Sequence, residues 1–226
     1  MKKQNRTLIL AALGCLTSFI LWTVLVVYVD VQPIGPENSA VGFAALNGAF
    51  HSLTGVHWML YALTDWLGLV PIVIALSFAG LGLHQLVQRR SILRVDRSIL
   101  ALGVFYIVVL AVYFLFEKVV INYRPVLVEN RLEASYPSST TMLALCILPT
   151  AMMQLSGRIR AGVIRKTVLL LLAIFSAFLV VGRLFSGVHW LSDIFGGVLL
   201  SAGLVLVYAW AFRNCGDVDS RGSQAK

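Results

Sequence analysis

The residues of this chain best suited to chemistry stand beside strongly apolar segments in its second half. They are Lys118, Arg124, Arg183, His189 and Asp193. Charged side chains are costly in or next to a lipid bilayer, so a set of them there indicates a functional site. Cations bind phosphate oxygens and an imidazole can attack phosphorus. The set therefore points to a site that holds a phosphate and transfers it.

His189 and Asp193 are four residues apart, a spacing that places both side chains on one face of a helix. The acid can accept a hydrogen bond from the imidazole or hold it from behind, which leaves the other ring nitrogen free as a nucleophile. In the alternative interpretation, His189 reaches the interface and Asp193 caps the helix. An acid one turn inside an apolar span costs about 2.5–3.5 kcal/mol on insertion scales, which favours a paired, functional Asp193.

The three cations are suited to binding a phosphate. Arg183 has a planar guanidinium that fits two phosphate oxygens at once. Arg124 precedes Pro125, which biases its backbone to extended geometry and aims the side chain from a loop. Lys118 comes directly after an apolar segment. Each cation alone could be a lipid-headgroup anchor, but three beside one histidine favour a shared phosphate.

Hydroxyl-bearing residues follow Pro137 at the start of another apolar segment: Ser138, Ser139 and Thr140. Ser138 can cap a helix, and the first amide groups of that helix form an anion site. A Pro-Ser-Ser start is common, so it gains weight only because the arginines accompany it.

The elements that must position these residues are membrane helices. Only 12% of the residues are charged and 59% are hydrophobic, as in integral membrane proteins. We predict six spans across the roughly 30 Å of hydrocarbon, at residues 8–29, 66–87, 98–116, 138–156, 167–182 and 190–212. The expected fold is an all-α, six-transmembrane-helix bundle, a single membrane domain over residues 1–226 with its motifs at 118–193. A disordered cytoplasmic tail is expected at 214–226.

A short interfacial segment is expected between the first two spans. Proline and glycine break the chain after Asp30, and residues 40–50 are apolar but too short to span. Aromatic side chains expected at headgroup depth follow them: Trp58, Tyr61 and Trp66. His51 and His57 lie in the same region and are interpreted as interfacial hydrogen-bonding residues.

The distribution of charge predicts the orientation. Six spans place the termini and the loops at 88–97 and 157–166 on one side, and these carry 14 of the 18 basic residues. The positive-inside rule makes that side cytoplasmic. The protein is therefore expected in the cell membrane as a multi-pass protein with cytoplasmic termini and an extracytoplasmic site. Because topology accounts for the net charge of +8, no nucleic-acid partner is expected.

No cofactor or metal is expected from the residue types. One histidine and one acid are too few for a zinc or two-metal site. No Gly-x-x-x-x-Gly-Lys-Ser/Thr loop for nucleotide phosphates is present. The three cysteines show no disulfide pattern. The oligomeric state is not predicted, and the partners expected are the bilayer and a lipid phosphate.

The candidate residues resemble the three motifs of the type 2 phosphatidic acid phosphatase superfamily, which includes membrane lipid phosphatases and vanadium haloperoxidases. Its third motif is Ser-Arg, five residues, His, three residues, Asp. Arg183, His189 and Asp193 match it, with Gly182 in place of the serine. The first motif is Lys, six residues, Arg-Pro, whereas five residues separate Lys118 from Arg124 here. The second is Pro-Ser-Gly-His, where this chain has Pro-Ser-Ser-Thr at 137–140.

The resemblance implies a function and a role for each residue. His189 would be the nucleophile that forms a phosphohistidine, and Asp193 would orient it. The phosphate would be bound by Arg183, Lys118, Arg124 and Ser138, with Ser139 and Thr140 as further candidates. We therefore expect a metal-independent membrane lipid phosphatase.

The threonine in the second motif raises a specific question. In the family, the histidine at that position protonates the leaving group, and Thr140 cannot do so at neutral pH. A lipid phosphate leaving from a diphosphate needs that proton less, since its second pKa is only about 6. A lipid diphosphate, such as a polyprenyl diphosphate, is therefore the expected substrate. Alternatively, His51 or His57 folds back to supply the proton.

Two other functions remain open. A non-catalytic lipid-phosphate binder or carrier is compatible with a missing general acid. A phosphotransferase would use the same phosphohistidine with another acceptor. A vanadium haloperoxidase is not expected in so hydrophobic a chain.

Overall fold

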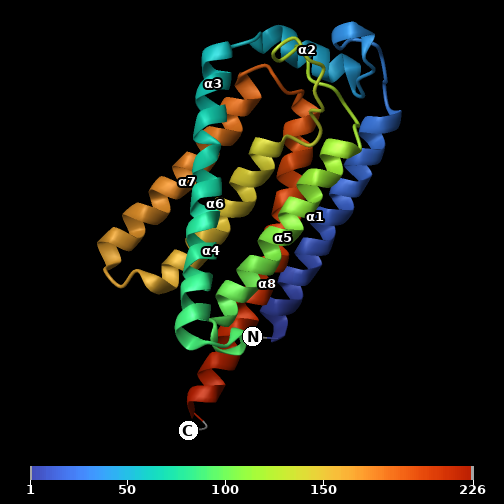
Figure 1. The fold of residues 1–226 in the computed structure, drawn as a ribbon. Coiled ribbons are helices and arrows are strands. Elements are labelled where there is room, and N and C mark those ends of the chain that lie inside the picture. The colour runs from blue at the N-terminus through green and yellow to red at the C-terminus, as the bar shows by residue number, and fades with distance from the viewer. Residues whose placement is uncertain (1, 225–226) are drawn as a thin grey trace.

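A computed structural model describes the backbone of residues 2–224 and the side chains of residues 3–215. Its helices are α1 (Lys2–Tyr28), α2 (Ala44–Thr54), α3 (Trp58–Leu67), α4 (Leu69–Arg89), α5 (Arg97–Lys118), α6 (Ser139–Arg158), α7 (Gly162–Phe185) and α8 (Leu191–Gln224). Two 3-10 helices, η1 (Pro36–Asn38) and η2 (Ile92–Arg94), lie in connecting loops. The all-α prediction is confirmed (Figure 1).

Six stretches are long and apolar enough to cross a membrane: Lys3–Tyr28, Trp58–Arg89, Arg97–Lys118, Ser139–Arg158, Gly162–Phe185 and Leu191–Cys215. Each overlaps one predicted span. Large apolar side chains along their flanks are exposed, for example Leu76 and Ile107 at 65% and 67%. Such flanks suit contact with lipid, and the six-span prediction is confirmed.

The second span is longer than predicted, because α3 continues almost directly into α4. Trp58, Tyr61 and Trp66, expected in a separate interfacial segment, belong to α3. Asp65 made the run look interrupted in the sequence. In the structure its carboxylate pairs with the Arg183 guanidinium at 2.8 Å, so the acid is accommodated within a span.

Two other expectations concern the ends of the elements. The short segment between the first spans folds as α2, an 11-residue helix too short to cross a membrane. In the part of the tail that the structure describes, α8 continues as a helix to Gln224 rather than ending at the predicted start of disorder. Residues 225–226 lie outside the described chain.

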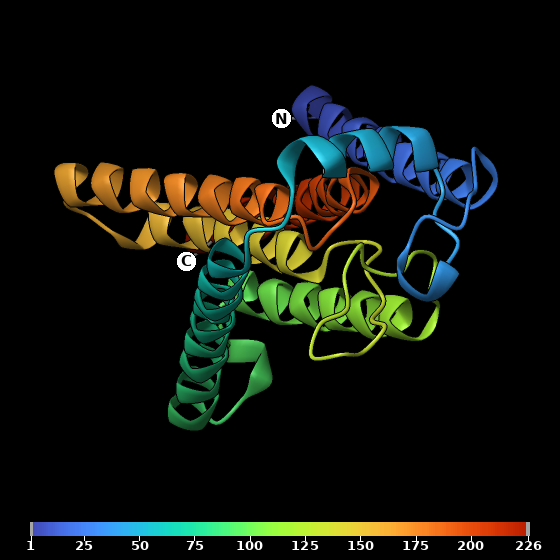
Figure 2. The same ribbon diagram turned by 90° about the horizontal axis from the view of Figure 1, so that it is seen from above.

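Helix α8 packs against both α1 and α6 (Figure 2). Glycines in α8 allow the close approach. A Cβ atom at Gly203 would lie 2.6 Å from the Leu16 side chain of α1. At Gly196 it would lie 2.7 Å from the Tyr136 ring. The glycines of the last span therefore bring its neighbours close enough to build a site at its start.

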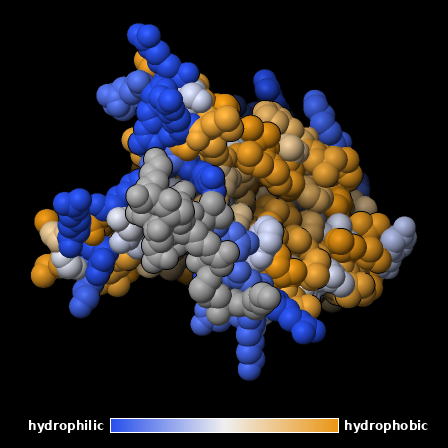
Figure 3. Space-filling model, turned by 90° about the horizontal axis from the view of Figure 1, so that it is seen from below, coloured by the Kyte–Doolittle hydropathy of each residue, from blue (hydrophilic) through white to orange (hydrophobic). Residues whose placement is uncertain are grey.

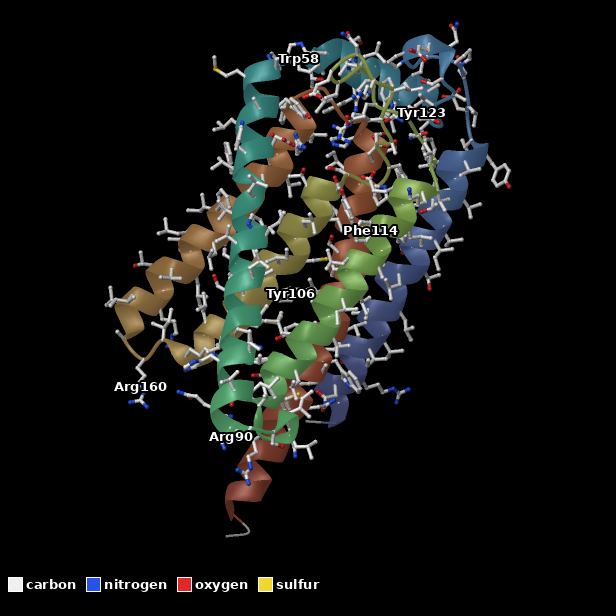
Figure 4. The ribbon with its side chains drawn as sticks, in the orientation of Figure 1. Trp58, Arg90, Tyr106, Phe114, Tyr123 and Arg160 are labelled. Atoms are coloured by element: carbon white, nitrogen blue, oxygen red, sulfur yellow. The ribbon has the colours of Figure 1, made fainter. Side chains whose placement is uncertain are left out.

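The two ends of the bundle differ in character. Both termini lie at one end (Figure 1), together with Arg90 and Arg160, whereas Trp58 and Tyr123 lie at the other (Figure 4). Figure 3 views the molecule from below, at the end where the termini lie. Hydrophilic side chains project around that end, and hydrophobic ones cover the flank. The basic loops thus share one end, as six spans require.

Candidate active site

Four of the predicted residues come together at the end of the bundle opposite the termini. Arg124 lies on the loop between α5 and α6, and Arg183 lies in the last turn of α7. His189 lies in the turn between α7 and α8, and Asp193 in the first turn of α8. Arg124, Arg183, His189 and Asp193 are all buried. Residues that come from separate segments of the chain therefore share one interior site.

The start of α6 is attached directly to this site. Ser138 is its N-cap, and the Ser138 hydroxyl accepts a bond from the Thr141 amide at 3.4 Å. The Ser138 amide donates to the Asp193 carbonyl oxygen at 3.1 Å. The first amides of a helix have no acceptor within it. The predicted anion-binding helix start thus lies beside Asp193.

Each ring nitrogen of His189 faces a charged side chain. Its Nδ1 lies 3.8 Å from Asp193 Oδ2, too far for a direct hydrogen bond but close enough for electrostatic attraction. The Asp193 carboxylate accepts bonds from the Trp190 amide at 2.9 Å and from Asn122 Nδ2 at 3.2 Å. A fixed carboxylate behind Nδ1 favours a proton on that nitrogen and leaves Nε2 to react.

The Nε2 nitrogen of His189 faces an arginine. Arg124 Nη1 lies 3.4 Å from His189 Nε2. Burial, followed by the positive charges of Arg124 and Arg183, lowers the pKa of His189 well below 6.5. The imidazole is therefore neutral at physiological pH, as a nucleophile must be.

Both arginines are held by carboxylates. Arg124 Nε lies 3.0 Å from Glu133 Oε2. Arg183 Nη2 donates to Asp65 Oδ1 and to Thr140 Oγ1, both at 2.8 Å. Asp65 and Glu133 are not among the residues predicted from the sequence. The signal for Asp65 was an acid inside an apolar run, which requires a buried cation to compensate it.

A cavity of about 700 Å³ lies between these groups, and we call it the polar cavity. Its polar lining includes Arg124, Arg183, Ser139, Thr140, Asp65, Glu117 and Glu133. His189 lines a much smaller adjoining cavity, which shares Glu117 and Ser139 with the polar cavity. The two arginines and the imidazole thus line neighbouring cavities that share wall residues.

Lys118 lies elsewhere. Its side chain is exposed at the end of α5 and does not line the polar cavity. The preceding residue, Glu117, does line it. Six residues separate Glu117 from Arg124, which is the spacing of the first family motif, so an acid stands where that motif has a lysine. The structure does not bring Lys118 to the other candidates.

A second, apolar cavity of about 480 Å³ lies between α4, α5 and α6, and we call it the apolar groove. Side chains such as Ile72, Leu76 and Leu110 line it. Four residues line both the apolar groove and the polar cavity: Asp65, Tyr113, Ser139 and Thr140. A molecule with a polar head and an apolar chain could therefore occupy both.

The two histidines considered as proton donors lie outside both cavities. His51 Nε2 contacts the Gly187 carbonyl oxygen at 3.2 Å, and its ring packs against Trp190. His57 Nε2 contacts the Thr54 carbonyl oxygen at 2.9 Å. Neither lines the polar cavity or the apolar groove. The His51 side chain thus links α2 to the α7–α8 turn, whereas the His57 side chain contacts the end of α2.

Two known proteins resemble this chain in its fold or in part of its sequence. A crystal structure described as the first transmembrane PAP2-type phosphatidylglycerolphosphate phosphatase from Bacillus subtilis superposes with a TM-score of 0.59. The match covers 93% of this chain and 96% of that one at 17% sequence identity, so it shows a shared fold. Human sphingosine-1-phosphate phosphatase 2 is 37% identical over 93 residues. That match spans 39% of this chain and 23% of the human protein.

The family assignment comes from the sequence itself. The family model of the PAP2 superfamily matches residues 100–217, just over half of the chain. This region contains the arginines, the helix start, the histidine and the acid of the site. The chain is a multi-pass membrane protein that belongs to the PAP2 superfamily of phosphatases.

Proposed function

We propose that this protein is a membrane lipid phosphatase that hydrolyses a lipid phosphate or polyphosphate through a phosphohistidine at His189. The observation that carries the proposal is the 3.4 Å approach of Arg124 Nη1 to His189 Nε2 beside the polar cavity. A phosphate bound by Arg124 would lie in contact with the nucleophilic nitrogen. Asp193 would hold the ring through its Nδ1 edge.

Each group around the polar cavity has a task in this reaction. Arg124 and Arg183 bind the phosphate oxygens and stabilise the negative charge of the transition state. The amides at the start of α6 and the Ser139 hydroxyl add hydrogen-bond donors. The phosphate replaces Glu133 and Asp65 as the partner of the two guanidinium groups. The lipid chain occupies the apolar groove.

The substrate class we infer first is a lipid diphosphate, such as a polyprenyl diphosphate. Thr140 stands where the family motif has its acidic histidine, and its hydroxyl accepts a bond from Arg183. Departure of a lipid monophosphate needs less protonation than departure of an alkoxide. The apolar side chains that line the groove are compatible with a polyprenyl chain.

The site is proposed to face the extracytoplasmic side. The basic loops and both termini lie at the opposite end of the bundle (Figures 1 and 4). The positive-inside rule assigns that end to the cytoplasm. The substrate headgroup would then be hydrolysed in the outer leaflet.

The test is phosphate release by purified protein in mixed micelles, with diphosphate and monophosphate lipids offered separately. The wild type should release phosphate, and His189→Ala should abolish release. His84→Ala is the matched control, since His84 is an exposed histidine of α4 at the other end of the molecule. Release that survives in His189→Ala would refute the phosphohistidine mechanism.

Two further readouts separate the alternatives. A labelled lipid phosphate should leave an acid-labile, alkali-stable label on the wild type but not on His189→Ala. Lipid binding without any release would identify a binder or carrier. Transfer of the label to another acceptor without free phosphate would identify a phosphotransferase.

A further inference from the structure

The proposed reaction lacks an obvious group to protonate the leaving oxygen. Thr140 is not an acid, and its hydroxyl is engaged with Arg183 at 2.8 Å. His51 and His57 contact backbone carbonyl oxygens outside both cavities. Some other side chain must supply the proton if the protein is to cleave an ordinary phosphate ester.

The position of the leaving oxygen follows from the shape of the site. The phosphate must lie with the arginines in the polar cavity, and the lipid chain must lie in the apolar groove. The bond between them then crosses the junction of the two spaces. Among the described residues that line both spaces, Asp65 is the only carboxylic acid.

Asp65 also lies directly beside the residue that replaces the family histidine. One nitrogen, Arg183 Nη2, is 2.8 Å from Asp65 Oδ1 and 2.8 Å from Thr140 Oγ1. The Asp65 side chain is 56% exposed, so a substrate can reach it. The carboxylate thus occupies the neighbourhood in which an acid is needed.

Close helix packing fixes Asp65 in this place. A Cβ atom on Gly182 of α7 would lie 2.6 Å from Thr64 Cγ2, so α3 and α7 touch one residue before the Asp65–Arg183 pair. A Cβ atom on Gly68 would lie 3.3 Å from Thr140 Cγ2 of α6. Asp65 is therefore held between α6 and α7 by small residues on both sides.

The other acids of the polar cavity are less well placed. Glu133 pairs with Arg124 and does not line the apolar groove. Glu117 faces the polar cavity and the small cavity that His189 lines, and it too is absent from the apolar groove. Both lie on the phosphate side of the expected bond rather than at the junction.

We propose that Asp65 is a catalytic residue that replaces the missing histidine as general acid and base. This inference rests on the proposed lipid phosphatase function. An entering phosphate takes over Arg183 and so releases the Asp65 carboxyl group to act on the leaving oxygen.

The chemical steps balance. His189 Nε2 forms a bond to phosphorus while the bond from phosphorus to the leaving oxygen breaks. The Asp65 proton goes to that oxygen, which gives an alcohol from a phosphate monoester or a lipid monophosphate from a diphosphate. Water then attacks the phosphohistidine, and the Asp65 carboxylate takes one of its protons. The nitrogen–phosphorus bond breaks, and inorganic phosphate leaves. With this acid in place, monophosphate esters as well as diphosphates fall within reach.

The test compares leaving groups. Asp65→Asn should lower turnover of phosphatidic acid by about 10²–10⁴-fold, the usual contribution of general acid catalysis. It should leave p-nitrophenyl phosphate much less affected, because nitrophenolate departs without a proton. Glu129→Gln, on an exposed loop residue outside both cavities, is the matched control and should match the wild type on both substrates.

A second variant shows whether the loss in Asp65→Asn comes from the missing acid or from misfolding. Asp65→Asn combined with Thr140→His restores the family histidine and should recover turnover of phosphatidic acid without a carboxylate at 65. Equal losses of Asp65→Asn on both substrates, or no loss on either, would overturn the assignment. His189→Ala should abolish both reactions, so a failure there would concern the proposed function and not Asp65.

Discussion

Arg124 Nη1 lies 3.4 Å from His189 Nε2, so the imidazole nitrogen that we propose as the nucleophile faces a guanidinium. Under the proposed mechanism, this arginine binds the phosphate, and its positive charge also lowers the pKa of His189. Binding and activation are therefore linked through one side chain, and substitutions there should affect both.

The pH dependence of activity should show this link. The pKa of His189 is lowered by burial and then by the two arginines. Protonation of His189 stops the proposed reaction. Because its pKa is lowered, His189 stays unprotonated and active as the pH falls past 6.5. The acid limb of kcat/KM that His189 sets should therefore lie below 6.5.

Arg124→Gln should move that limb upward, because it removes one positive neighbour of the imidazole. It should also weaken phosphate binding and lower kcat/KM by about 10²–10³-fold, as for loss of one donor to a transition-state oxyanion. The measurement is a pH profile of kcat/KM for both proteins. An unchanged acid limb would show that Arg124 does not face the imidazole in the working enzyme.

Asp193→Asn should reduce kcat far more than it changes KM. The carboxylate is buried and accepts bonds from the Trp190 amide and Asn122, while its charge faces His189 Nδ1. An amide cannot attract the Nδ1 proton in the same way, so the reactive tautomer is lost. We expect a fall in kcat of up to about 10⁴-fold, measured by steady-state phosphate release. A fall in substrate affinity alone would instead place Asp193 in phosphate binding.

Lys118→Ala should leave phosphate release within about twofold of the wild type, because this exposed lysine does not line the polar cavity. Steady-state release measured beside Arg124→Gln gives the comparison. A loss as large as that of the arginine variant would restore Lys118 to the phosphate-binding set that the family resemblance implies.

Gly182→Ser, which introduces the serine of the family motif, should destabilise this protein. The added Cβ would lie 2.6 Å from Thr64 Cγ2, and the Thr64 hydroxyl is fixed by bonds to the Leu60 and Tyr61 carbonyl oxygens. Overpacking of this kind costs about 1–3 kcal/mol. Thermal unfolding in detergent measures the loss.

Thr64→Ser removes the obstructing methyl group and keeps the hydroxyl. The double variant Gly182→Ser/Thr64→Ser should therefore recover most of the lost stability. Equal melting temperatures for the wild type and Gly182→Ser would show that α3 and α7 are not closely packed here.

Much of the fold and part of the site follow from the sequence alone. Apolar runs interrupted by basic loops define six spans, and the spacing of Arg183, His189 and Asp193 marks the site. Arg124, on a loop, is also predicted from the sequence, and it lies beside the imidazole. Each of these features lies within a short stretch of the chain, so it can be predicted from the sequence.

The remaining features depend on contacts between distant segments. Asp65 and Arg183 are 118 residues apart, and only the crossing of α3 and α7 makes them partners. Whether Lys118 or Glu117 lines the polar cavity depends on which side of the last turn of α5 faces it. Sequence spacing does not determine that direction where the helix ends and an irregular loop begins.

The termini and the proposed site lie at opposite ends of the bundle, which determines where the phosphate is released. Under the proposed reaction and orientation, each turnover liberates inorganic phosphate into the compartment that does not contain the termini. That phosphate must recross the membrane before it can be reused inside, whereas the dephosphorylated lipid stays in the bilayer.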